Sequence, residues 1–90
     1  MKTKFKTLNN WISKMVLQSL VNSDLRSAIY ILFNCHNDLE TEVFHKTFKI
    51  IVSWCDSDFD KLTEFTHEYC SCEVSCFVHS TLNSLYHEKN

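Results

Sequence analysis

The feature that most restricts the fold of this chain is the complete absence of glycine and proline from its 90 residues. Average usage of the two is about 12%, so a chain of this length would ordinarily hold roughly ten of them. Tight β-hairpins usually need glycine, often as Asn-Gly, at positive φ. The turns must therefore be built by Asn, Ser and Asp, and helices joined by short turns are expected.

Apolar residues recur at steps of three and four, which is the spacing of amphipathic helices. Breaks in this pattern carry cap residues at Ser23, Asp38 and Ser57. The pattern predicts an all-α fold without a sheet, a compact bundle of four to five short helices. We expect them at about 5–21, 24–35, 38–55, 58–70 and 72–87. Whether 58–87 is one kinked helix or two helices joined at Ser71 stays open from the sequence.

The segment 38–55 has the widest apolar face in the chain and is predicted to lie at the centre of the core. Trp11 and Trp54 fall on apolar stripes, so both are assigned to the core. On this basis we expect replacement of Phe48 or Trp54 by alanine to lower the free energy of unfolding by about 3 to 5 kcal/mol.

Length and composition indicate a single domain over residues 1–90, with 1–4 as a candidate flexible basic arm. No stretch approaches the roughly 20 apolar residues of a membrane span. Polar residues at Asn9, Asn10 and Lys14 interrupt the apolar run that a signal peptide would need. The odd number of cysteines, five, suits reduced thiols. We therefore expect a cytoplasmic or nuclear protein that is not secreted.

A cluster of potential metal ligands occupies thirteen residues near the C-terminal end: His67, Cys70, Cys72, Cys76 and His79. Cysteine and histidine are the usual zinc ligands. In a helix beginning by Cys72, the side chains of Cys72, Cys76 and His79 share a face opposite the apolar stripe. Their spacing matches no common zinc module. Packing against another helix or subunit is therefore preferred, with a zinc site as the alternative.

The charge is unevenly distributed along the chain. Residues 1–26 carry five basic side chains against one acid, a balance of +4, whereas residues 27–90 carry four lysines against ten acids, a balance of −6. Lys2, Lys4 and Lys6 are the candidate contacts for nucleic acid, which requires clustered positive charge. Because the remainder of the chain is acidic, a solvated arm is favoured and nucleic-acid binding is not expected.

The sequence lacks the motifs on which most catalytic mechanisms depend. No glycine-rich loop is present to bind phosphate, which excludes the usual modes of nucleotide binding. A Cys/His nucleophilic pair needs an oxyanion hole and a third orienting group, for which a small glycine-free bundle has little room. We therefore predict a protein that is not an enzyme and has no cofactor, zinc being the alternative.

The wide apolar faces predict a small protein–protein interaction module that self-associates, most simply as an isologous homodimer. Two alternatives are a zinc-supported regulatory domain using the C-terminal cluster and a weak nucleic-acid binder using the N-terminal lysines. In its short length and its content of Asn, Lys, Phe and Cys, the chain resembles compact viral accessory proteins, such as small proteins of large plant RNA viruses. The resemblance covers no motif and implies a host-facing or replication-supporting adaptor in the cytoplasm.

Overall fold

The computed structural model describes the backbone of residues 2–86 and the side chains of residues 9–86. This part of the chain forms five α-helices and one short 3-10 helix: α1 (Lys2–Val21), α2 (Leu25–Cys35), η1 (His36–Asp38), α3 (Thr41–Trp54), α4 (Phe59–Tyr69) and α5 (Cys72–Tyr86). It contains no strand, which confirms the all-α prediction. The described part of the region, residues 58–86, forms two helices, separated at Cys70 and Ser71.

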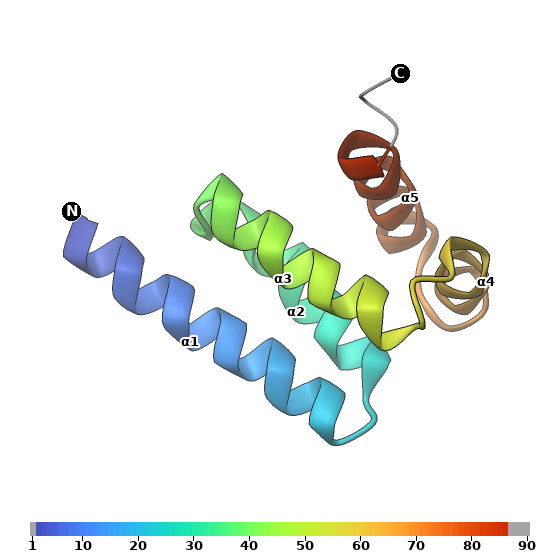
Figure 1. Ribbon diagram of the computed structural model, residues 1–90, viewed down its shortest axis with the longest axis horizontal. Coiled ribbons are helices and arrows are strands. Elements are labelled where there is room, and N and C mark those ends of the chain that lie inside the picture. Colours follow the sequence, from blue (N-terminus) through green and yellow to red (C-terminus); the bar gives the residue numbers. More distant parts are fainter. Residues whose placement is uncertain (1, 87–90) are drawn as a thin grey trace.

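The helices are arranged around α2. Helices α1 and α3 run in the same direction, α2 runs against both of them, and α4 and α5 follow as a separate hairpin (Figure 1). Helix α2 packs against α1, α3 and α5. The segment 38–55 contributes to the core as predicted, through Leu39, Phe48, Ile51, Val52 and Cys55. Its buried face is narrower than predicted, because Ile50 and Trp54 are exposed.

The turn between α1 and α2 reverses the chain without glycine. Ser23 takes a left-handed conformation with φ of 61°, its N–H donates to the Leu20 carbonyl at 2.9 Å, and the Asp24 N–H donates to the Ser19 carbonyl at 2.8 Å. These two bonds form a Schellman motif, which satisfies the last carbonyls of α1. Asp24 then caps α2 by accepting from the Ser27 N–H at 3.1 Å. Hydrogen bonding from the Ser27 side chain and, secondly, from its backbone lowers the pKa of the carboxyl group.

A similar turn connects α3 to α4. Asp56 and Ser57 have φ values of 61° and 58°, and Asp58 caps α4 by accepting from the Lys61 N–H at 3.2 Å. The expectation that Asn, Ser and Asp build the turns is thus confirmed. The exact cap positions differ, because Ser23 and Ser57 occupy the left-handed positions and the following aspartates, Asp24 and Asp58, supply the caps.

The start of α3 differs from the sequence prediction. Asp38 lies in η1 and does not cap α3, which begins at Thr41 with Glu40 at its N-cap position and no side-chain cap bond. Instead, the Oδ1 atom of Asn9 on α1 accepts from the Glu40 N–H at 3.2 Å. Asn9 is buried. A distant side chain therefore takes over part of the capping role and ties α1 to the beginning of α3.

The α4–α5 junction is held against α2 by two side chains. The Nε atom of Arg26 donates to the Tyr69 carbonyl at 2.8 Å, and its guanidinium group lies 5.0 Å from the centre of the Tyr30 ring. The Tyr30 hydroxyl accepts from the Ser71 N–H at 3.0 Å. Hydrogen bonding from the Ser71 side chain and, secondly, from its backbone lowers the Tyr30 pKa. We call these contacts the α2 clamp.

The core consists of one face from each of the helices and differs from the prediction at both tryptophans. Phe48 is 1% exposed, as expected, but Trp11 is 64% exposed and Trp54 is 48% exposed. Trp54 lies outside the core because the buried face of α3 is narrow and centres on Phe48 and Ile51. The apolar residues of the sequence are therefore more numerous than the core requires.

We predict that Ser23→Gly raises the free energy of unfolding by about 0.5–1 kcal/mol, because glycine adopts the left-handed conformation without the steric cost that serine has. Chemical denaturation measures the difference. As a matched control, Ser80→Gly at an exposed position inside α5 should lower the same free energy by about 0.5 kcal/mol. Destabilisation by Ser23→Gly would contradict the role assigned to this turn.

We predict that Phe48→Ala lowers the free energy of unfolding by about 3–5 kcal/mol. The half-exposed Trp54 serves as the comparison, and Trp54→Ala should cost no more than about 1.5 kcal/mol because much of its surface is already in water. Urea or guanidinium titrations of both variants test this. Equal losses would show that Trp54 belongs to the core.

Candidate interaction surface

Two helices that contribute to the core also carry large apolar side chains on their outer surfaces. Their exposed fractions range from 40% for Ile50 to 74% for Val21. The set comprises Trp11, Met15, Leu17 and Val21 on α1 and Ile50 and Trp54 on α3. Among the described residues, Tyr69 at the end of α4 is the one further large apolar side chain exposed to this degree.

The exposed residues on α1 follow from the direction of its buried stripe. Asn9, Ile12, Val16 and Leu20 face the core, at the three- and four-residue spacing of a single helical face. Trp11 precedes Ile12 by one position, which turns its side chain by about 100° away from that face. The sequence interpretation assigned Trp11 to the core stripe, and the polar Asn9 hid the true direction of that stripe.

A hydrogen bond fixes the register between α1 and α3. The hydroxyl groups of Ser13 and Thr47 lie 3.2 Å apart. Because the Thr47 hydroxyl donates to the Val43 carbonyl at 2.8 Å, the Ser13 hydroxyl is the donor to Thr47. The two helices run in the same direction from this point (Figure 1), so their next turns lie beside one another.

The turns beyond this hydrogen bond carry four exposed apolar residues, Leu17 and Val21 on α1 and Ile50 and Trp54 on α3. Each pair is spaced by four residues and therefore projects from one side of its helix. Trp54 is seven residues beyond Thr47, so it continues the side of α3 that meets Ser13. We call these four residues the apolar seam.

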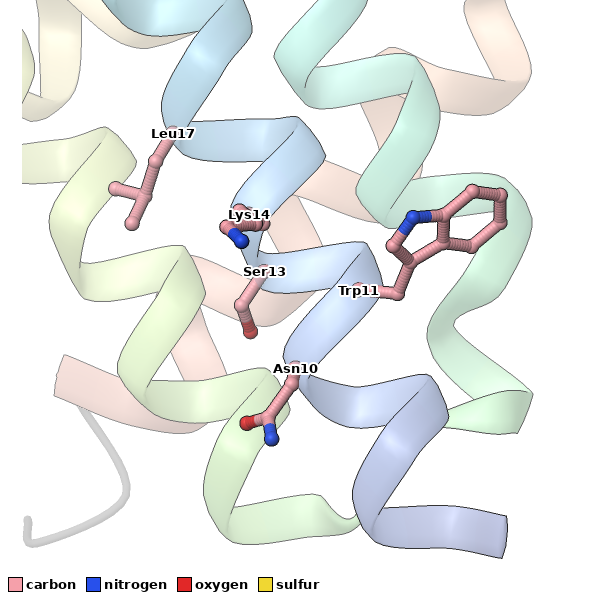
Figure 2. Close-up of a pocket in the computed structure, with 5 residues that line it drawn as sticks. All are labelled: Asn10, Trp11, Ser13, Lys14 and Leu17. Carbon is pink, nitrogen blue, oxygen red and sulfur yellow. The ribbon is translucent and has the colours of Figure 1, made fainter.

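A surface pocket of about 570 Å³ adjoins the seam along α1 and is lined by Asn10, Trp11, Ser13, Lys14 and Leu17. In Figure 2, Leu17 points toward α3 whereas Trp11 points to the opposite side of α1, over α2. Leu17 therefore belongs to both the pocket and the apolar seam. Asn10, Ser13 and Lys14 add polar groups to the lining, whose apolar part comes from Trp11 and Leu17.

The charged side chains Lys14 and Lys46 lie at the N-terminal end of the seam, whereas Asp24 and Asp56 follow Val21 and Trp54 at its other end. Lys14 on α1 and Lys46 on α3 are exposed, one turn before Leu17 and Ile50 respectively. Helix α1 contains no acidic residue, and Glu42 is the one acid in α3. Among the described side chains, the ion pair that forms is Lys61 with Asp56, at 3.1 Å. Lys14 and Lys46 therefore have no acidic partner in the described part of the chain.

Cys72, Cys76 and His79 are exposed on α5, while Val74 and Val78 on the same helix are buried. The predicted orientation of this face, away from the core, is therefore correct. In the part of the chain that the structure describes, no group of three or more His, Cys, Asp or Glu side chains is placed to hold a metal ion. The zinc hypothesis gains no set of ligands from these residues.

The N-terminal lysines lie on helical backbone. Helix α1 begins at Lys2, so the backbone of residues 2–4 is not the flexible arm considered from the sequence. The side chains of Lys2, Lys4 and Lys6 lie outside the described residues. The prediction that they contact nucleic acid therefore stays a prediction.

The five cysteines, all free thiols, fall into two groups. Cys72 and Cys76 are exposed, whereas Cys55 is buried and Cys35 and Cys70 are partly buried. Burial raises the pKa of Cys35, Cys55 and Cys70, because it disfavours the charged thiolate. Since the thiolate is the reactive form, chemical reactivity should be confined to the α5 face.

We predict that a thiol reagent such as Ellman's reagent labels two of the five cysteines rapidly in the native protein, and the other three only as it unfolds. The double variant with Cys72→Ser and Cys76→Ser should lose the rapid phase. Cys55→Ser, in contrast, should retain it. A rapid phase that survives the double variant would show that the assignment of exposed thiols is incorrect.

None of the described helices is both long and apolar enough to cross a membrane. In comparisons with known proteins, no family model, no curated protein and no solved structure matches the chain.

Proposed function

We propose that this chain is a non-enzymatic protein–protein interaction module that binds its partner through the exposed apolar residues of α1 and α3. The observation that carries the proposal is the exposure of the apolar seam, with Leu17 41% and Trp54 48% exposed, on helices whose other faces form the core. Tryptophan is enriched at the energetic centres of protein interfaces. Contiguous exposed apolar surface is characteristic of docking sites.

The energetics of these side chains support a binding role. Full burial of a large apolar side chain is worth roughly 1.5–3 kcal/mol, and six such side chains on α1 and α3 forgo much of that gain in the isolated chain. A partner that covers the side chains of the apolar seam would recover part of this burial free energy. The helices that carry this surface are held in place, because their other sides pack in the core.

The proposed function admits two kinds of partner, a second copy of the chain, as in the predicted homodimer, or a different protein. The free thiols support placement in a reducing compartment, the cytoplasm or the nucleus. An adaptor of the kind suggested by the resemblance to viral accessory proteins would act in this way, by docking without chemistry of its own.

We predict that Leu17→Ser combined with Trp54→Ser abolishes partner binding while the fold is retained, because both side chains are at least 40% exposed. Sedimentation velocity detects association between copies, and affinity capture from cell extract detects other partners. Tyr69→Ser, an equally exposed change at the end of α4, is the control and should leave binding intact. A chain that stays monomeric and captures nothing that depends on these two residues would refute the proposed function.

A further inference from the structure

We propose that the apolar seam binds an amphipathic α-helix of a different protein, with carboxylates on the partner helix facing Lys14 and Lys46. This inference rests on the proposed function and specifies the partner's chemistry. It follows from the shape of the seam, from the charges beside it and from the distribution of charge over the rest of the chain.

The spacing of the exposed residues favours a helical partner. Leu17 and Val21 repeat at one turn on α1, and Ile50 and Trp54 repeat at one turn on α3, in two rows that run in the same direction. A helix laid along two such rows presents apolar residues at the matching three- and four-residue steps. From Asn10 in the adjoining pocket to Val21, α1 offers about 16 Å of length, or roughly three turns of a bound helix.

The charges beside the seam determine which side chains are favourable on the flanks of the partner helix. Lys14 is three residues before Leu17, and Lys46 is four residues before Ile50, so each ammonium group borders the seam from its outer side. Neither lysine is paired among the described residues. Acidic side chains on both flanks of a bound helix would meet these ammonium groups, whereas lysines there would be repelled.

A second copy of this chain does not meet these requirements. Two seams joined with their helices parallel would bring the Lys14 and Lys46 side chains of both copies together, with no acid on α1 and only Glu42 on α3 to offset them. Two seams joined antiparallel would bring these lysines toward Asp24 and Asp56, whose carboxylates already accept from the Ser27 N–H and pair with Lys61. Helix α4 is acidic at Asp60, Glu64 and Glu68. However, its apolar side chains, Phe59, Leu62 and Phe65, pack within its own core, so α4 has no free stripe to cover the seam.

The test uses two Trp-free peptides of about 14 residues, held helical by a hydrocarbon staple, with leucines at three- and four-residue steps. One peptide carries glutamates on its flanks, and the other carries lysines at the same positions. Trp11→Phe leaves Trp54 as the single tryptophan, so its emission reports contact at the seam. We expect the glutamate peptide to shift this emission to shorter wavelength and to bind about tenfold more tightly than the lysine peptide.

Three further measurements make the test specific to the seam. Lys14→Glu combined with Lys46→Glu should reverse the preference between the two peptides. Leu17→Ser should weaken binding of the glutamate peptide about tenfold, while Tyr69→Ser should leave it unchanged. Raising the salt concentration from about 0.02 M to about 0.3 M should narrow the difference between the peptides, because salt screens exposed charges.

Equal affinity for the two peptides, or no binding of either, would overturn this inference. So would a shift of Trp54 emission by vesicles containing anionic lipid when neither peptide binds, since that result would indicate a membrane surface. A dimer that Leu17→Ser dissociates would also overturn it, although it would uphold the proposed function. The experiments thus distinguish a wrong choice of partner from a wrong assignment of the chain as an interaction module.

Discussion

Reversal of the backbone without glycine is the constraint on which this fold depends. Ser23, Asp56 and Ser57 all take the left-handed conformation, which costs a residue with a Cβ atom about 1–2 kcal/mol. Each turn offsets this cost with hydrogen bonds that close the helix before it, and each passes directly to an aspartate that caps the helix after it. Short, rigid turns keep consecutive helices close together and leave little freedom in their relative placement.

The direction of the first three helices follows from the turn at Ser23 and from η1, which connects α2 to α3. The surface of the molecule follows from this direction. Because α2 reverses the path of α1 and α3 reverses it again, α1 and α3 become neighbours that run the same way (Figure 1). The bonds from Asn9 to Glu40 and from Ser13 to Thr47 then set their register. Residues that are distant in sequence, such as Leu17 and Trp54, are thereby brought to one side of the protein. The proposed binding surface arises from packing rather than from any local motif.

The sequence was sufficient for the fold class and for the approximate helices, because helical periodicity and the cap residues are local signals. It was insufficient for the exposed apolar surface, which depends on the direction in which each helix faces. Trp11 and Trp54 resemble core residues on any apolar scale, and only the contacts between helices show that Asn9 takes the inner position on α1. The sequence also could not predict that Asn9 replaces a local cap at the start of α3, since this hydrogen bond joins residues 31 positions apart. By contrast, the outward face of Cys72 and Cys76 was predictable, because it depends on spacing within a single helix.

The α2 clamp has a consequence for how the chain can vary. Arg26 and Tyr30 hold the α4–α5 junction by its backbone, through the Tyr69 carbonyl and the Ser71 N–H. A main-chain carbonyl is present whichever amino acid occupies position 69, so the attachment places no demand on that side chain. The exposed surface at the end of α4 can therefore change its chemistry from one sequence to another while the joint beneath it keeps the same geometry. The geometry of the junction therefore depends on Arg26 and Tyr30 of α2, and the side chain at position 69 can change without altering it.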